Sequence, residues 1–124
     1  MTKKSKQGTC KVFLTHRAVA DLLGIEEYTV ARWGKGAATK YISKFEKAFC
    51  LVEMNECLLL PNPYLSDSLL FFRVEKHLMA CIRIGEGVAV LTIIHANRDL
   101  PKILHELTPS LTEEVAFLRS RLGE

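Results

Sequence analysis

The densest run of hydrophobic residues lies in the second half of the chain and is interrupted by glycine. Residues 77–84 and 88–95 are both rich in Ile, Val and Leu, and a Gly-Glu-Gly tripeptide separates them. Glycine reaches positive φ without a steric penalty, so this spacing predicts a β-hairpin with a short loop. Residues 69–73 form a third apolar run that predicts another strand. We therefore expect an antiparallel sheet on which the rest of the chain packs.

Upstream of this sheet the hydrophobic residues recur at helical spacing. One helix is predicted from residue 17 to Trp33, and Gly34-Lys35-Gly36 ends it. A second helix follows over residues 38–52, so the two form an antiparallel helical hairpin. We expect Trp33 to be a core anchor between the hairpin and the sheet. The polar face of the second helix carries Lys40, Lys44 and Lys47, which predicts a solvated surface rather than a nucleic-acid site.

The segments that flank these elements are shorter. Residues 11–15 predict a strand, and Thr15 is a plausible N-cap for the first helix. Residues 55–67 contain two prolines and no clear periodicity, which predicts a loop pinned to the core by its leucines.

The C-terminal part predicts two helical pieces. A short helical turn to Leu107 is broken at Thr108-Pro109, and Ser110 with Glu113 forms a capping box for a final helix. The apolar stripe of that helix consists of Leu111, Val115, Leu118 and Leu122. Short isolated helices are marginal in water, so the stripe must cover either its own chain or a second subunit. We favour docking within the chain, because one short stripe makes a small dimer interface.

These elements predict an α+β fold. It has an N-terminal strand, an antiparallel helical hairpin packed on an antiparallel β-sheet, and an extra C-terminal helix. The predicted organisation is a disordered tail at residues 1–9, one domain over residues 10–107 and an amphipathic helical extension over residues 108–124.

Composition narrows the class of protein. A chain of 124 residues with 48% hydrophobic residues and a net charge of +3 fits one folded domain without a strong nucleic-acid bias. It contains no apolar run long enough to span a membrane and no secretory signal, so we expect a cytoplasmic protein. The four cysteines form no C-x-x-C pair. We therefore expect free, mostly buried thiols, no metal and no cofactor.

Two stretches resemble a known family. The first is Glu27-Tyr28-Thr29, followed by Trp33-Gly34, Ala38 and Tyr41; the second runs from Phe72-Arg73-Val74-Glu75-Lys76-His77-Leu78 through the hairpin to Ile94-His95-Ala96-Asn97-Arg98-Asp99-Leu100-Pro101. Together they are similar to the ParE branch of the RelE/ParE toxin superfamily, over about residues 10–104. The chain departs from that pattern at Leu70, where the family often has arginine, and at Ala80-Cys81, where it often has an aromatic pair.

The resemblance implies the toxin of a type II toxin–antitoxin pair. Such a toxin acts as a binding poison rather than an enzyme, with DNA gyrase as its target and a cognate antitoxin as its partner; a homo-oligomer is possible. The antitoxin tail would be disordered alone and, on binding, add a strand to an open edge of the sheet and lay a helix in the groove of the helical hairpin. We expect it to bind at the apolar flank of the helical hairpin formed by Val19, Leu23 and Val30.

The RelE branch offers an enzymatic alternative, a ribosome-dependent mRNA endonuclease. This reaction needs a base for the ribose 2′-hydroxyl and cations for the phosphorane-like charge. His77 and His95 lie at strand ends; His95 or Asp99 is a candidate base, and Arg73 and Arg83 are candidate cations. The simpler interpretation is that all are solvated edge residues and that Asp99 caps a helix before Pro101.

A third alternative is a DNA-binding helix-turn-helix within residues 16–33. Ala20, Gly24 and Val30 stand at the spacing of that motif, which would direct Thr29 and Arg32 toward a major groove. Against it, the recognition helix would begin with Glu26-Glu27, which repel phosphates.

Overall fold

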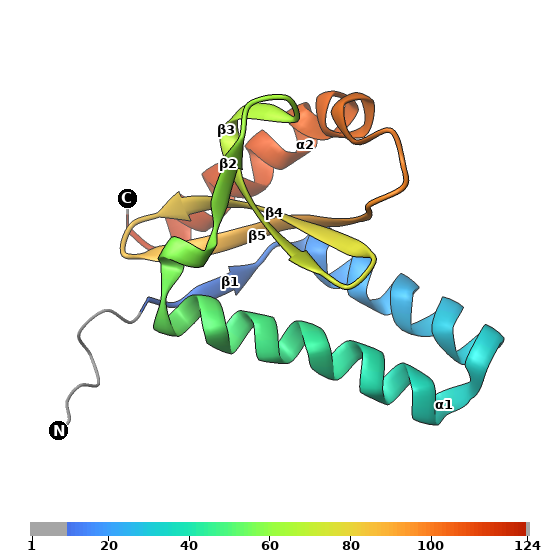
Figure 1. Ribbon diagram of the computed structural model, residues 1–124. Coiled ribbons are helices and arrows are strands. Elements are labelled where there is room, and N and C mark those ends of the chain that lie inside the picture. Colours follow the sequence, from blue (N-terminus) through green and yellow to red (C-terminus); the bar gives the residue numbers. More distant parts are fainter. Residues whose placement is uncertain (1–9, 124) are drawn as a thin grey trace, which may run out of the picture.

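The computed structural model describes residues 10–123, so the tail predicted at residues 1–9 lies outside the described residues. A five-stranded sheet of order β1-β5-β4-β3-β2 lies between helix α1 on one face and helix α2 on the other (Figure 1). The elements are β1 (Val12–Leu14), α1 (His16–Met54), η1 (Glu56–Leu58), β2 (Leu60–Asn62), β3 (Ser66–Val74), β4 (His77–Ile84), β5 (Gly87–His95) and α2 (Leu100–Arg121). The predicted α+β fold is confirmed.

The sheet is antiparallel except at one edge. Strands β2, β3, β4 and β5 pair antiparallel in sequence order, whereas β1 lies parallel to β5. The β4–β5 hairpin closes over Gly85 and Glu86, and Gly85 has the positive φ of 58° that its turn requires. The prediction of a plain loop over residues 55–67 is wrong, because this segment includes η1 and the edge strand β2.

Helix α1 is a helical hairpin, as predicted. Gly34 has φ 91° and ψ 171° and reverses the chain between a first arm (residues 16–33) and a second arm (residues 35–54). Figure 1 shows the two arms side by side beneath the sheet. Thr15 caps the first arm by accepting a hydrogen bond from the Ala18 N–H at 3.0 Å.

The prediction that Trp33 anchors the core is wrong. Trp33 is 61% exposed because it precedes the reversal at Gly34, at the tip of the hairpin. Its ring packs edge-on against Tyr28, with 6.2 Å between ring centroids, and the Arg32 guanidinium lies 5.4 Å from the Trp33 ring centroid.

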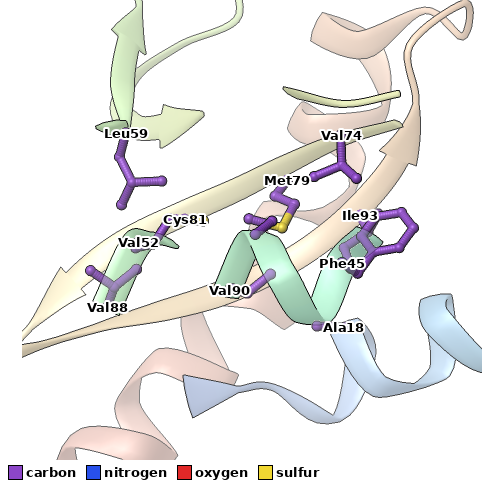
Figure 2. Close-up of a cluster of buried hydrophobic side chains, with 11 residues drawn as sticks. Ala18, Phe45, Val52, Leu59, Val74, Met79, Cys81, Val88, Val90 and Ile93 are labelled. Carbon is purple, nitrogen blue, oxygen red and sulfur yellow. The ribbon is translucent and has the colours of Figure 1, made fainter. Parts of the chain in front are cut away.

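The main core lies between α1 and the sheet. Phe45 of the second arm meets Met79 of β4 and Ile93 of β5 in this cluster, which Figure 2 shows. Strand β5 contributes Val88, Val90 and Ile93 to this face instead of strictly alternate residues. The reason is a bulge at Leu91, since Cys81 pairs with Val90 while its neighbour Ala80 pairs with Thr92.

The start of α1 binds this bulge. The Thr15 hydroxyl donates to the Leu91 carbonyl at 2.8 Å. The Asp21 carboxylate accepts from the Thr92 hydroxyl at 2.6 Å and from the Ile93 N–H at 2.9 Å. Strand β1 pairs with β5 only as far as Val90, so polar groups on this edge of β5 beyond Val90 are paired by the start of α1, and the first arm is held against β5.

Helix α2 differs from its prediction. It is continuous from Leu100 to Arg121 with Pro109 inside, and Ser110 is not an N-cap because its hydroxyl donates to the Leu107 carbonyl at 3.2 Å. Asp99 is the cap, accepting from the Lys102 N–H at 3.3 Å. An internal proline costs about 3 kcal/mol, and packing of both halves on the sheet offsets this cost.

The apolar stripe of α2 docks within the chain, as favoured from sequence. Leu104 packs with Phe71, Ala80 and Ile94, and Leu111 packs with Ile84, Ala89 and Leu91. Val115 and Leu118 pack against the cluster that contains Leu111, whereas Leu122 is exposed. The sheet therefore has one face covered by α1 and the other by α2.

Asp21→Ala should lower the free energy of unfolding by about 2 to 4 kcal/mol, because it leaves the Thr92 hydroxyl and the Ile93 N–H without their partner. A urea melt measures this change. Asp67→Ala removes an exposed carboxylate on β3 and serves as the control, with an expected effect within about 0.5 kcal/mol. Equal losses in the two variants would contradict the role assigned to Asp21.

Candidate functional site

A groove of about 840 Å³ runs between the first arm of α1 and the ends of β4 and β5. We call it the histidine groove. Its lining residues are Arg17, Ala20, Asp21, Gly24, Ile25, Tyr28, Thr29, Trp33, Ala37, Tyr41, Lys76, His77, Ile93, Ile94, His95, Asn97, Arg98 and Ile103. The wall from α1 owes its position to the contact of Asp21 with the β5 bulge.

Two histidines and a tyrosine meet in this groove. His77 and His95 are cross-strand partners in the β4–β5 ladder, with 5.0 Å between ring centroids. The Tyr41 hydroxyl lies 2.8 Å from His77 Nδ1 and accepts from the Lys76 N–H at 3.4 Å. A phenol oxygen has two lone pairs and one O–H, so it accepts from Lys76 whichever of the two atoms donates in the Tyr41–His77 hydrogen bond.

The tautomer of neutral His95 is fixed by its own hydrogen bond. His95 Nδ1 accepts from the Asn97 N–H at 3.2 Å, so the remaining proton of the neutral ring is on Nε2. His77 Nδ1 is engaged with the Tyr41 hydroxyl, which leaves Nε2 as the ring nitrogen of His77 available to a ligand.

Burial controls the charge of this cluster. Burial, followed by the charges of the neighbouring His95 and Arg73, lowers the pKa of His77 to about 4. Burial also raises the pKa of Tyr41 above its usual range. His77 is therefore neutral at pH 7.

The lining of the groove contains more cationic than anionic side chains. Arg17 Nε lies 3.2 Å from Asp21 Oδ1, so these two charges form an ion pair. Lys76 and Arg98 also line the groove, and neither forms an ion pair within residues 10–123. The lining of the groove therefore carries an excess of positive charge.

The structure divides the residues predicted for catalysis. His77 and His95 come together, but Arg83 pairs with Glu56 near the opposite end of β4. Arg73 lies outside the histidine groove and donates to the Glu75 carbonyl. Arg83 is thus far from the histidines, whereas Arg73 lies outside the groove but near enough to lower the pKa of His77.

Tyr41 is the member of the cluster for which the sequence predicted no functional role. Its ring packs on the apolar face of the second arm, edge-on to Phe45 with 5.7 Å between ring centroids. Its hydroxyl extends past that face to His77. A tyrosine at the polar end of an apolar stripe was the signal available in the sequence.

The residues predicted to bind an antitoxin form a separate surface. Val19, Leu23 and Val30 are 43%, 56% and 36% exposed, and none lines the histidine groove. At 100° per residue they project from one side of the first arm, which we call the outer stripe. Large apolar side chains are seldom exposed in such a row without a partner.

The helix-turn-helix alternative is wrong. Gly24 lies within an unbroken arm, and Gly34 is the position with non-helical dihedral angles inside α1. Residues 16–33 therefore form one straight element instead of two helices joined by a turn.

Two other depressions lie outside the histidine groove. One, of about 530 Å³, is rimmed by Lys40, Lys44 and Lys47 and by Arg73, and Lys44 pairs with Glu75 at 2.9 Å. We call it the lysine groove. The other, of about 650 Å³, lies between α2 and β3.

The cysteines were predicted to be mostly buried, which is wrong for two of them. Cys50 and Cys57 are exposed, Cys81 is buried, and all four are free thiols. Within residues 10–123 no group of three His, Cys, Asp or Glu side chains is placed to hold a metal ion. None of the helices in that range is both long and apolar enough to cross a membrane.

Comparison with known proteins gives consistent matches. A family model described as the ParE toxin of the type II toxin–antitoxin system, parDE, matches residues 12–100. Toxin ParE of Escherichia coli is 35% identical over 88 residues, which cover 70% of this chain and 85% of that protein. A chain of the chromosomal ParDE TA system from P. aeruginosa superposes with a TM-score of 0.64 at 16% identity, covering 73% of this chain and all of that one. The last match shows the fold.

The lowered pKa of His77 predicts a pH-dependent stability. Between the unfolded value of 6.5 and the folded value of about 4, the unfolded chain binds a proton that the folded chain does not. The free energy of unfolding should therefore fall as the pH drops through this window. Because the ring is only half-buried, we expect a loss of about 1 to 2 kcal/mol.

Urea melts at pH 7 and pH 4.5 measure this loss, and His77→Gln should reduce it. His105→Gln, which changes an exposed histidine on α2, is the matched control and should retain the wild-type dependence. An unchanged dependence in His77→Gln would contradict the assignment.

Proposed function

The chain belongs to the ParE toxin family of type II toxin–antitoxin systems, and from this premise we propose that a cognate antitoxin neutralises it and that DNA gyrase is its target. The observation that carries the antitoxin proposal is the exposed outer stripe on the first arm of α1. The gyrase proposal comes from the family, whose members act as binding poisons. We also propose that the protein acts in the cytoplasm, where that target is found.

The outer stripe suits an amphipathic helix of the antitoxin. Its residues are spaced at i, i+4 and i+11 along the first arm and share one side of it, with the exposed Glu26 between Leu23 and Val30. The arm is held rigidly by Thr15 and Asp21, so it needs little ordering when a partner binds. An antitoxin segment that is disordered alone would fold against this preformed surface.

The sheet edges are less suited to adding an antitoxin strand. At β1, the Val12 N–H already donates to the Glu53 carboxylate at 3.3 Å. At the other edge, β2 is three residues long and contains Pro61, which has no N–H to offer. Both edges are thus blunted, which favours docking on the helix over strand addition.

A second candidate function is RNA cleavage, favoured by the Tyr41–His77–His95 cluster. A neutral histidine beside a second histidine is able to take a proton from a ribose 2′-hydroxyl. Arg98 and Lys76 would stabilise the developing phosphate charge. This candidate ranks second because the family acts by binding.

Leu23→Glu should weaken antitoxin binding at least about tenfold, because it places a charge in an apolar interface. The stability of the free toxin should change little, since Leu23 is exposed. Calorimetric titration with the product of the adjacent reading frame measures the affinity. Tyr64→Ala is the control, because Tyr64 is 91% exposed and lies near β2, far from α1 in sequence. Equal affinities of Leu23→Glu and wild type would overturn this surface.

Expression of the wild-type chain should cause filamentation and DNA damage, and purified protein should inhibit DNA supercoiling by gyrase. His77→Gln combined with His95→Gln should leave this inhibition intact, because a binding poison needs no acid–base pair. Rapid arrest of protein synthesis that this double variant abolishes would instead establish RNA cleavage.

A further inference from the structure

We infer that the histidine groove is a binding site for a carboxylate, in which Lys76 and Arg98 supply charge and His77 and His95 supply hydrogen-bond donors. This inference deepens the proposed function, because it describes what a partner segment presents to the groove. It does not depend on the outer stripe, which lies on a different flank of the first arm.

The first argument is the charge of the groove. Its single lining carboxylate, Asp21, is already used by Arg17, the Thr92 hydroxyl and the Ile93 N–H. Lys76 and Arg98 have no anionic partner within residues 10–123. Two like charges along one concave surface attract an oxyanion more strongly than either does alone.

The second argument is the state of the imidazoles. The Asn97 N–H donates to His95 Nδ1, so the neutral His95 ring retains its proton on Nε2, and the Tyr41 hydroxyl engages His77 Nδ1, so a protonated His77 donates to a ligand through Nε2. Both rings line the groove. A carboxylate has about four lone-pair positions and accepts from several such donors together.

The third argument separates this site from the lysine groove. There, Lys44 is already paired with Glu75, and the lysines rim an exposed helix face. The histidine groove instead joins cations to partly buried donors with apolar walls such as Ile25, Ile93 and Ile103. That combination suits an acidic side chain on an otherwise apolar segment.

Binding of a carboxylate should be coupled to proton uptake. In the free protein His77 is faced by Tyr41 on α1, by His95 on β5, by Arg73 on β3 and by Lys76 in the β3–β4 turn. Across the groove lie the Arg17–Asp21 pair and Arg98. Two carboxylates lie among these groups, and both are engaged: Asp21 with Arg17, and Glu75 of the β3–β4 turn with Lys44. The other groups are neutral or cationic and disfavour a protonated imidazole. A bound anion opposes them, so affinity should rise as the pH falls.

The test uses calorimetric titration of the full chain with deca-L-glutamate at pH 6.0 and pH 7.5. The peptide should bind more tightly at pH 6.0, by up to about tenfold per pH unit if one proton is taken up. His77→Gln should still bind but lose most of this pH dependence. His105→Gln, outside the groove, should behave as wild type; equal pH dependence in the wild type and His77→Gln would overturn the proton coupling.

A pair of charge-matched variants locates the site. Lys76→Gln with Arg98→Gln should weaken binding at least about tenfold, whereas Lys40→Gln with Lys47→Gln removes the same charge from the lysine groove and should have a much smaller effect. Equal losses would overturn the site. Displacement of the peptide by equimolar inorganic phosphate would overturn the carboxylate assignment. Loss of antitoxin binding in Leu23→Glu with unchanged peptide binding would uphold the two surfaces as separate.

Discussion

The structure depends on one contact, between the start of α1 and the bulge in β5. An extra residue at Leu91 shifts the register between β4 and β5, and β5 continues beyond the end of β1, so its backbone groups on that edge must be paired elsewhere. The Thr15 hydroxyl donates to the Leu91 carbonyl, and the Asp21 carboxylate accepts from the Ile93 N–H. The same bulge turns Val88, Val90 and Ile93 toward α1. Core packing and the placement of the first arm therefore have a common cause.

The position of the first arm creates two surfaces. One flank faces the ends of β4 and β5 across the histidine groove, and the other exposes the outer stripe. Because the arm is fixed by hydrogen bonds and not by burial of every apolar side chain, it can leave large hydrophobic residues in solvent. The exposed flank is the surface that we propose for the antitoxin.

Helix α2 completes the fold on the other face of the sheet. The match to the ParE family model ends at residue 100, where α2 begins. Its Leu104 and Leu111 cover Phe71, Ala80, Ile84 and Ala89, which a bare sheet would expose. A hydrogen bond also joins the two helices. The Glu114 carboxylate of α2 accepts from the His16 N–H at 2.6 Å, at the positive end of the α1 dipole. The extension thus contacts both the sheet and the start of α1.

The sequence by itself determined the order and type of the main elements, the glycine reversal at Gly34, the caps at Thr15 and Asp99, and the family. These features depend on local periodicity and on backbone preferences that act over a few residues. The bulge, the exposure of Trp33, the continuity of α2 through Pro109 and the meeting of Tyr41 with His77 were decided by the tertiary structure. Each is a balance between a local preference and burial against residues far away in the chain. Proline's local penalty is outweighed by leucines that reach the sheet, whereas tryptophan's preference for burial fails because no sheet lies beneath the hairpin tip.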